Sequence, residues 1–200
     1  MTTLFVQTPS APLSIDFPWI NPMTEAQFYE FCLANRELRI ERTARGEVIV
    51  MPPAFSDTGN RNFNIAAQLW NWIERDGTGL GFDSSSGFTL PNGAMRSPDA
   101  AWIKLERWNA LTDKQKASFA PICPDFVIEL RSASDTVPSL QKKMAEYIAN
   151  GTVLGWLIDR QNQMVYIYRP HQEPVILNSP ERVSGEPELS GFELVMAKIW

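Results

Sequence analysis

The sequence has 200 residues, of which 44% are hydrophobic and 20% are charged. This length and composition are ordinary for a single globular domain. The formal net charge is -5 and the isoelectric point is about 5.0. That acidity argues against a protein that coats nucleic acid, because nonspecific affinity comes largely from Lys and Arg side chains that neutralise phosphates. It does not exclude a nucleic-acid enzyme, since a local basic patch and a carboxylate metal site can coexist with an acidic total.

The cysteines and the N-terminal segment bear on the compartment. Cys32 and Cys123 form no C-x-x-C pair and have no zinc-ligand spacing, so we interpret them as small core residues in a reducing compartment. The first 20 residues lack a basic segment and contain three prolines, unlike a signal peptide. No apolar run reaches the roughly 18 residues of a membrane-spanning helix. We therefore expect a cytoplasmic protein without membrane contact.

The N-terminal third predicts an arm, a helix, a hairpin and a second helix. Residues 1–22 form a proline-rich extended arm, which we expect to pack on its own domain or on a partner chain. Thr24 opens a helix through a capping box with Gln27. Residues 39–53 read as a hairpin. A helix follows over residues 58–76 and ends at a glycine. Its expected apolar stripe is Phe63, Ala66, Leu69, Trp70 and Ile73.

The rest of the chain alternates strands and helices. FDSSSGFTLP and AMRSPDAAWI predict a hairpin around the Asn92-Gly93 turn. DFVIEL is a short, β-prone apolar run, as a buried central strand should be. The other predicted elements are a helical connection over 107–119, a helix over 139–151 and a hairpin over 153–169. We expect one domain over residues 23–200, with an α/β (α+β) fold in which helices flank a mixed central sheet.

Several kinds of catalytic site are excluded by composition. His171 is the only histidine and lies in a polar loop, which argues against Ser-His or Cys-His pairs and rules out a histidine-rich metal site. Residues 84–87 (SSSG) have neither the lysine nor the spacing of a phosphate-binding loop. Any catalysis must therefore come from carboxylates, lysine and arginine.

Glu129 lies within the predicted central strand. Strand alternation places Val127, Glu129 and Arg131 on one face. A buried carboxylate is costly unless it is paired or bound to a cation. Two explanations stay open: an ion pair with Arg131 along the same face, or a metal site.

Asp99 follows Pro98 and precedes two alanines, which leave space beside its carboxylate. The alternative is an aspartate that caps a turn after proline. Lys143 lies at the inner edge of a helical stripe, whereas Lys142 points about a third of a turn away, toward solvent. The alternative for Lys143 is a side chain that extends along the apolar surface without a partner.

These residues together suit phosphodiester hydrolysis. Asp99 and Glu129 can hold magnesium, which prefers carboxylate oxygens and keeps several waters. Lys143 can orient the attacking water or neutralise charge on the phosphoryl oxygens. As a bare pattern of Asp, Glu and Lys the signal is weak, because most chains of this length contain one.

The strings SPDAAWI, CPDFVIELRSASD and QKKMAEYIANGTVLGWLID resemble the Uma-two family of bacterial proteins, which is classed with restriction endonucleases. RIERTARGEVIVMPP and FDSSSGFTLPNGAMRSPD resemble it too, so the likeness runs from about Arg39 to Arg169. The family belongs to the PD-(D/E)XK nuclease superfamily and has long been a domain of unknown function.

The resemblance implies a sheet flanked by helices and a divalent cation, Mg²⁺ or Mn²⁺, held by Asp99 and Glu129. The superfamily motif places lysine two residues after the glutamate, where this chain has Arg131. The resembling family supplies its lysine from the following helix, which matches Lys143. Glu41 is the nearest match to a further superfamily glutamate, and a solvated hairpin charge is the alternative.

The leading hypothesis is a Mg²⁺- or Mn²⁺-dependent DNA endonuclease, assembled as a homodimer so that two sites address two strands. The alternative is a catalytically silent module of the same fold that serves binding or assembly. A carboxylate-pair glycosidase is a third hypothesis, favoured only by the seven tryptophans, for which core packing is the simpler explanation.

Overall fold

The computed structural model describes residues 13–15 and 23–200. Its main sheet contains β4 (Gly79–Asp83), β7 (Ala100–Lys104), β8 (Phe126–Leu130), β9 (Leu154–Asp159), β10 (Met164–Tyr168) and β11 (Val175–Asn178). Their order is β11-β10-β9-β8-β7-β4. β8 and β9 are parallel, and the other neighbouring pairs are antiparallel. The expected mixed central sheet is therefore confirmed.

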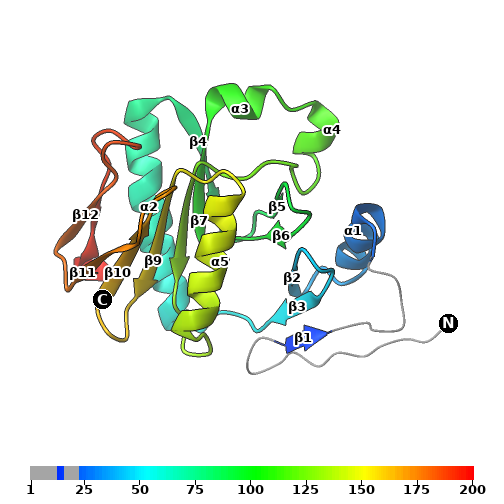
Figure 1. Ribbon diagram of the computed structural model, residues 1–200, viewed down its shortest axis with the longest axis horizontal. Helices are drawn as coiled ribbons and strands as arrows, with labels where there is room; N and C mark the ends of the chain where they lie inside the picture. The colour runs from blue at the N-terminus through cyan, green and yellow to red at the C-terminus, as the bar shows by residue number, and fades with distance from the viewer. Residues whose placement is uncertain (1–12, 16–22) are drawn as a thin grey trace.

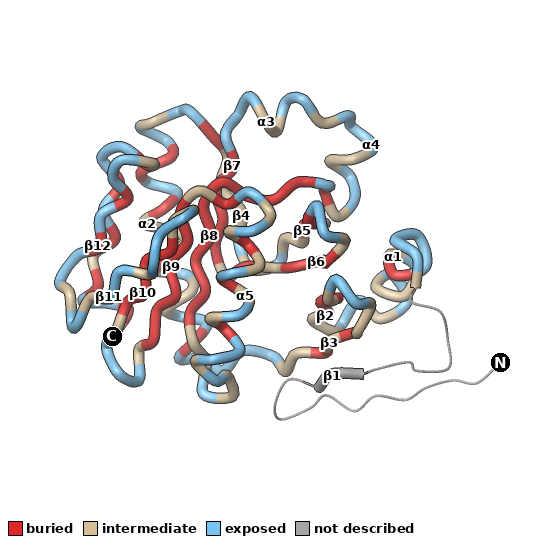
Figure 2. Tube along the Cα trace, in the orientation of Figure 1, coloured by how far each residue is buried: buried red, intermediate tan, exposed pale blue. Residues whose placement is uncertain are grey.

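Two helices, α2 (Ser56–Asp76) and α5 (Val137–Ala149), cover opposite faces of this sheet (Figure 1). α2 packs on the face that includes Trp102, Phe126 and Ile128. α5 packs on the other face, which includes Val127 and Leu157. Figure 2 shows buried residues concentrated along the central strands between the helices. Glu129 lies two residues after Val127 and therefore shares the α5 face.

A second sheet has the order β1-β3-β2-β6-β5. Its strands are β1 (Leu13–Ile15), β2 (Arg39–Arg42), β3 (Val48–Met51), β5 (Phe88–Thr89) and β6 (Met95–Arg96). α1 (Glu25–Ala34) covers β2 and β3 through Phe28. The predicted capping box at Thr24 and the predicted β2–β3 hairpin are both confirmed. The predicted arm lies outside the described residues apart from β1, and the domain boundary at residue 23 stays a prediction.

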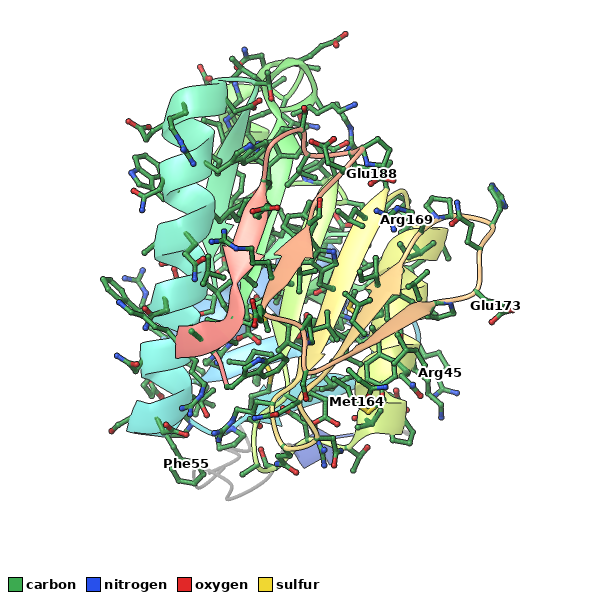
Figure 3. All side chains as sticks on the ribbon, turned by 90° about the vertical axis from the view of Figure 1, so that its left-hand side faces the viewer. Arg45, Phe55, Met164, Arg169, Glu173 and Glu188 are labelled. Atoms are coloured by element: carbon green, nitrogen blue, oxygen red, sulfur yellow. The ribbon has the colours of Figure 1, made fainter. Side chains whose placement is uncertain are left out.

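The remaining elements are two short helices, a two-stranded sheet and a 3₁₀ helix. They are α3 (Leu105–Asn109), α4 (Asp113–Lys116), β12 (Arg182–Ser184), β13 (Glu193–Val195) and the 3₁₀ helix η1 (Met196–Lys198). Figure 3, seen from the α2 side, shows β12 and β13 beside α2 in front of the sheet. Within the described ranges, no helix has the length and apolar character needed to cross a bilayer.

The predicted hairpin around Asn92-Gly93 is only partly right. The turn forms, with Leu90 N donating to Ala94 O at 2.8 Å, but it closes only the short β5–β6 pair. β7 pairs instead with β4, and this pairing stops at Asp83 and Ala100. The chain between these two residues leaves the main sheet and joins the second one. The segment predicted as one hairpin therefore belongs to two nested strand pairs, β4–β7 in the main sheet and β5–β6 in the second sheet.

The predicted stripe of α2 is wrong at two positions. Phe63 is 72% exposed and Trp70 is 55% exposed, whereas Trp72 is 4% exposed. The buried face follows Ile65, Leu69 and Trp72, at helical spacings of four and three residues. Trp70 lies about 200° from Trp72 around the helix and faces outward. The helix itself and its end at Gly77, which has φ of 68°, are confirmed.

Gly155 allows α5 to lie close to β9. A Cβ at this position would stand 2.4 Å from Met144 Cε and 3.5 Å from Val127 Cγ2. We expect Gly155→Ala to lower the free energy of unfolding by about 1 kcal/mol, because the end of the buried Met144 side chain must shift to make room, measured by urea denaturation. Gly59→Ala is the control, because open space surrounds that helical glycine, and it should raise stability by about 0.5–1 kcal/mol. Equal effects of both changes would contradict this explanation.

Candidate active site

α5 brings the Lys143 ammonium between two buried carboxylates. Lys143 Nζ lies 2.8 Å from Glu129 Oε1 and 2.8 Å from Glu41 Oε1. Only 13% of its side chain is exposed, because the next residue, Met144, is fully buried against the sheet. Lys142 is exposed, as the helical geometry predicts. Lys143 therefore has partners and does not merely extend along the surface.

Glu41 is buried behind Lys143. Its Oε2 accepts a hydrogen bond from Arg96 Nη1 at 3.0 Å, and its Oε1 accepts one from Ser97 N at 2.9 Å. Arg96 Nε also donates to Glu146 Oε2 at 2.6 Å. Since Glu41 is 2% exposed, the alternative of a solvated hairpin charge is wrong. The antiparallel pairing of Arg42 with Met95, continued by one residue, places Arg96 opposite Glu41.

Asp99 lies directly before β7 and beside the end of β8. Its Oδ2 accepts a hydrogen bond from Leu130 N at 2.8 Å, and its Oδ1 accepts one from Asn62 Nδ2 at 2.9 Å. Because Ala100 pairs with Ile128, the antiparallel register continued by one residue places Asp99 opposite Glu129. The two carboxylates thus belong to the same face of neighbouring strands. Asp99 contacts residues distant in sequence, so the turn-cap alternative is wrong.

The proposed in-strand ion pair between Glu129 and Arg131 is wrong. Arg131 Nη1 lies 3.0 Å from Asp159 Oδ1 and 3.1 Å from Asp159 Oδ2. β8 ends at Leu130, and Arg131 N donates to Ile158 O at 2.9 Å. This bond carries Arg131 to the end of β9, where Asp159 lies. Lys143, not Arg131, is the cation beside Glu129.

Burial and charge set the protonation of the cluster. Burial raises the pKa of Glu129 to about 7, and the Asp99 and Glu41 carboxylates add to this effect while Lys143 opposes it. Burial also raises the pKa of Asp99. Burial opposes ionisation of Glu41, but Lys143 and Arg96 hold its pKa below the usual range. Burial opposes the charge on Lys143, but Glu129 and Glu41 raise its pKa, so it stays protonated.

A cavity of about 90 Å³ opens at this cluster. Asp99, Glu129 and Lys143 line it, together with Arg39, Thr58 and Asn62. Phe55, at the N-terminal end of α2, also lines it, and this residue is 67% exposed (Figure 3). A separate groove of about 390 Å³ is lined by Glu41, Arg96 and Glu146 and also reaches Lys143. Lys143 therefore stands between the two spaces.

The residues that line the cavity fit a hard cation that keeps most of its waters. Within residues 13–15 and 23–200, no cluster of three or more His, Cys, Asp or Glu side chains could hold a metal ion. Asp99 and Glu129 offer two carboxylates, which is enough for Mg²⁺ with water and substrate oxygens as its other ligands. Asn62 Nδ2 donates to Asp99, and Asn62 Oδ1 is buried without a hydrogen-bond partner among the residues that the structure describes. An all-oxygen set suits Mg²⁺ or Mn²⁺.

Sequence reasoning missed four residues around these side chains. Tyr147 OH donates to Glu129 Oε1 at 3.0 Å, and Asn62, Arg96 and Asp159 hold the other charged groups. Tyr147 was recognisable as a stripe residue whose buried hydroxyl required an acceptor. Asn62 lies on the buried face of α2, three residues before Ile65, and a polar residue there is a usable signal. No local pattern marked Arg96 or Asp159.

The sheet, the paired carboxylates and the helical lysine define a restriction-endonuclease-like α/β protein. The Uma2 family model, described as "Putative restriction endonuclease", matches residues 25–197, and the chain belongs to this family. The resemblance found in the sequence is thus confirmed. The fold is similar to a crystal structure described as "a putative nuclease belonging to DUF820" from Anabaena variabilis, with a TM-score of 0.69. The two chains are 21% identical over 82% of this chain and 90% of that chain. No curated protein matches the sequence.

Lys143→Met should leave the buried Glu129 carboxylate without a positively charged partner. Glu41 would still pair with Arg96, but Glu129 would lose its nearest cationic side chain. We expect the free energy of unfolding to fall by about 3–5 kcal/mol at a pH where Glu129 is ionised, measured by urea denaturation. Lys142→Met is the matched control and should stay within about 0.5 kcal/mol of the wild type. A similar small effect of both changes would show that Lys143 does not stabilise the buried carboxylates.

Glu129 should also make stability depend on pH. Its pKa is about 7 in the folded chain, against 4.5 for an unperturbed glutamate. Its contribution to stability is therefore fully present below pH 4.5 and is lost as the pH rises through about 7. Glu129→Gln cannot titrate. Without divalent cations, the variant should therefore gain stability relative to the wild type between about pH 5 and about pH 8. Urea denaturation at both pH values measures this difference, and a constant difference would contradict the raised pKa.

Proposed function

We propose that this chain is a divalent-cation-dependent endonuclease that hydrolyses phosphodiester bonds of DNA. The observation that carries the proposal is that Asp99, Glu129 and Lys143 line one cavity, with the ammonium in contact with Glu129. Membership of a family described as "Putative restriction endonuclease" supports the nuclease class. Asp99 and Glu129 are the residues at which the sequence resembles the family motif.

In this proposal Asp99 and Glu129 hold Mg²⁺ or Mn²⁺. When bound, the cation supplies Lewis-acid chemistry at a phosphoryl oxygen. The protein fixes both carboxylates beforehand: Leu130 N and Asn62 hold Asp99, and Tyr147 holds Glu129 through Oε1. Tyr147 and Lys143 both contact Glu129 through Oε1, so in this proposal Oε2 is the oxygen that binds the cation.

Lys143 supplies a permanent positive charge and hydrogen-bond donors. Its ammonium has three N–H groups, and Glu129 and Glu41 engage it at 2.8 Å each. The third N–H can orient the attacking water or stabilise charge that develops on the phosphoryl oxygens. Glu41 is a positioning residue in this scheme, because it holds Lys143 from behind and lines the groove rather than the catalytic cavity.

The alternative is a catalytically silent module that keeps the fold for binding or assembly. It predicts no cation affinity, so calorimetric titration with Mn²⁺ separates it from the nuclease. The glycosidase hypothesis has lost its support, since Trp102 and Trp156 are buried in the core and none of the tryptophans within residues 23–200 lines the cavity. The homodimer that would address both DNA strands stays a prediction.

Glu129→Gln should abolish Mg²⁺- or Mn²⁺-dependent nicking of plasmid DNA. The change removes one cation-binding charge and keeps the shape of the side chain. Without cation, the melting temperature should be unchanged or higher, because Lys143 keeps Glu41 as a partner and Asp99 loses a neighbouring like charge. Glu193→Gln is the control, because Glu193 is half-exposed and pairs with Arg182, and neither residue lines the cavity. This variant should nick plasmid DNA as the wild type does.

Two results would contradict the proposal. Nicking that survives Glu129→Gln would place the reaction elsewhere. A wild type that gives no heat with Mn²⁺ and no cation-dependent nicking would make the chain the silent module.

A further inference from the structure

We propose that the N-terminal end of α2, with Thr58 and Arg39, binds a phosphodiester group of the DNA substrate. The inference rests on the proposed function, because the site uses the same cavity. It assigns a role to residues outside the carboxylate–lysine set. Three independent features of the cavity wall support it.

The first feature is the free end of the helix. α2 has 21 residues, and its N-cap residue, Phe55, provides no side-chain hydrogen bond. Gly59 N donates to Phe55 O at 2.9 Å, but the N–H groups of residues 56–58 find no acceptor in the described part of the chain. Unpaired N–H groups and the helix dipole together favour an anion at this end. Phe55 and Thr58 line the cavity, so this end borders the candidate active site.

The second feature is the hydroxyl of Thr58. The residue is 4% exposed, and its Oγ1 is buried without a hydrogen-bond partner within residues 13–15 and 23–200. A helical threonine can donate to the carbonyl four residues earlier, yet this one does not. A buried hydroxyl without a partner is costly. A phosphate oxygen in the cavity would accept its hydrogen bond and remove that cost.

The third feature is Arg39, on β2 two residues before Glu41. Its side chain lines the cavity and forms no ion pair with any described residue. It lies close enough to Asp99 to lower the pKa of that carboxyl, although burial, which raises this pKa, dominates. A guanidinium presents paired donors that match two phosphate oxygens. Arg39 can therefore bind a phosphate from β2 while the N-terminal end of α2 supplies donors to the same cavity.

One charge in the first turn of α2 could oppose an anion. Asp57 is acidic, but its carboxylate pairs with Arg61 on the same helix and lies 2.7 Å from Arg160 Nη1. It also does not line the cavity. Two guanidinium groups thus neutralise this carboxylate, and the helix end keeps its attraction for phosphate.

The cavity lining then combines two kinds of groups. Thr58, Arg39, Lys143 and the helix N–H groups are donors, whereas Asp99, Glu129 and Asp135 offer carboxylate acceptors. A phosphodiester oxygen suits the donors and a hydrated cation suits the acceptors. A DNA phosphate with its cation would satisfy both kinds of groups together.

DNA binding can be measured without cleavage in the Glu129→Gln chain. We would titrate a fluorescent DNA duplex without divalent cation, by anisotropy, between roughly 50 and 200 mM salt. Adding Arg39→Gln should weaken binding and reduce the slope of log affinity against log salt by about 0.9, one phosphate contact. Adding Thr58→Val should weaken binding roughly tenfold, as expected for one hydrogen bond to a charged group, with the slope unchanged. Arg75→Gln, an exposed arginine near the other end of α2, is the control and should change neither quantity.

Thr58→Val should not lower the melting temperature, because the hydroxyl it removes has no partner. A loss of affinity in that variant is then a loss of contact, not of folding. If Arg39→Gln and Thr58→Val bind DNA as tightly as their parent, the phosphate site is wrong, while loss of nicking in Glu129→Gln would still support the nuclease. If the parent binds no DNA and the wild type does not nick it, both proposals fail.

Discussion

The contact of the Lys143 ammonium with Glu41 and Glu129 is the interaction on which this structure depends. It joins β2 of the second sheet, β8 of the main sheet and α5. Two buried carboxylates without this cation would repel each other and resist ionisation. The lysine therefore holds the second sheet against the main sheet and also defines one wall of the cavity. Stability and the candidate chemistry rest on the same three side chains.

The parts of this arrangement that follow local periodicity could be predicted from the sequence. Alternation along the strand placed Glu129 on the face of Val127, and helical spacing turned Lys143 inward and Lys142 outward. The buried run FVIEL and the helix ended by Gly77 needed no tertiary information. Asp99 was assigned to the site from the small residues that follow it and from the resemblance to a family motif, since an aspartate after proline also has a common local explanation.

What sequence reasoning missed depends on partners that are distant in the chain. Arg131 and Glu129 share a strand pattern, yet Arg131 pairs with Asp159 because the parallel register of β8 and β9 brings their ends together. Arg96 reaches Glu41 across 55 residues because β6 joins the second sheet. Phe63 and Trp70 fitted an apolar stripe at helical spacing, but packing on the sheet decides which face of α2 is buried. Local patterns indicate which residues need a partner, whereas the topology of the fold determines which residue that partner is.

The acidic total charge has a consequence for how such a site could work on DNA. A chain with a net charge of -5 gains little from long-range attraction to DNA, so affinity must come from contacts made at short range. The cavity concentrates these contacts, because Arg39, Thr58 and the end of α2 line it together with the carboxylates. A carboxylate wall repels a bare phosphate and attracts a cation, whereas the same wall with a cation attracts phosphate. Substrate and cation would then bind cooperatively, since each removes the charge that opposes the other.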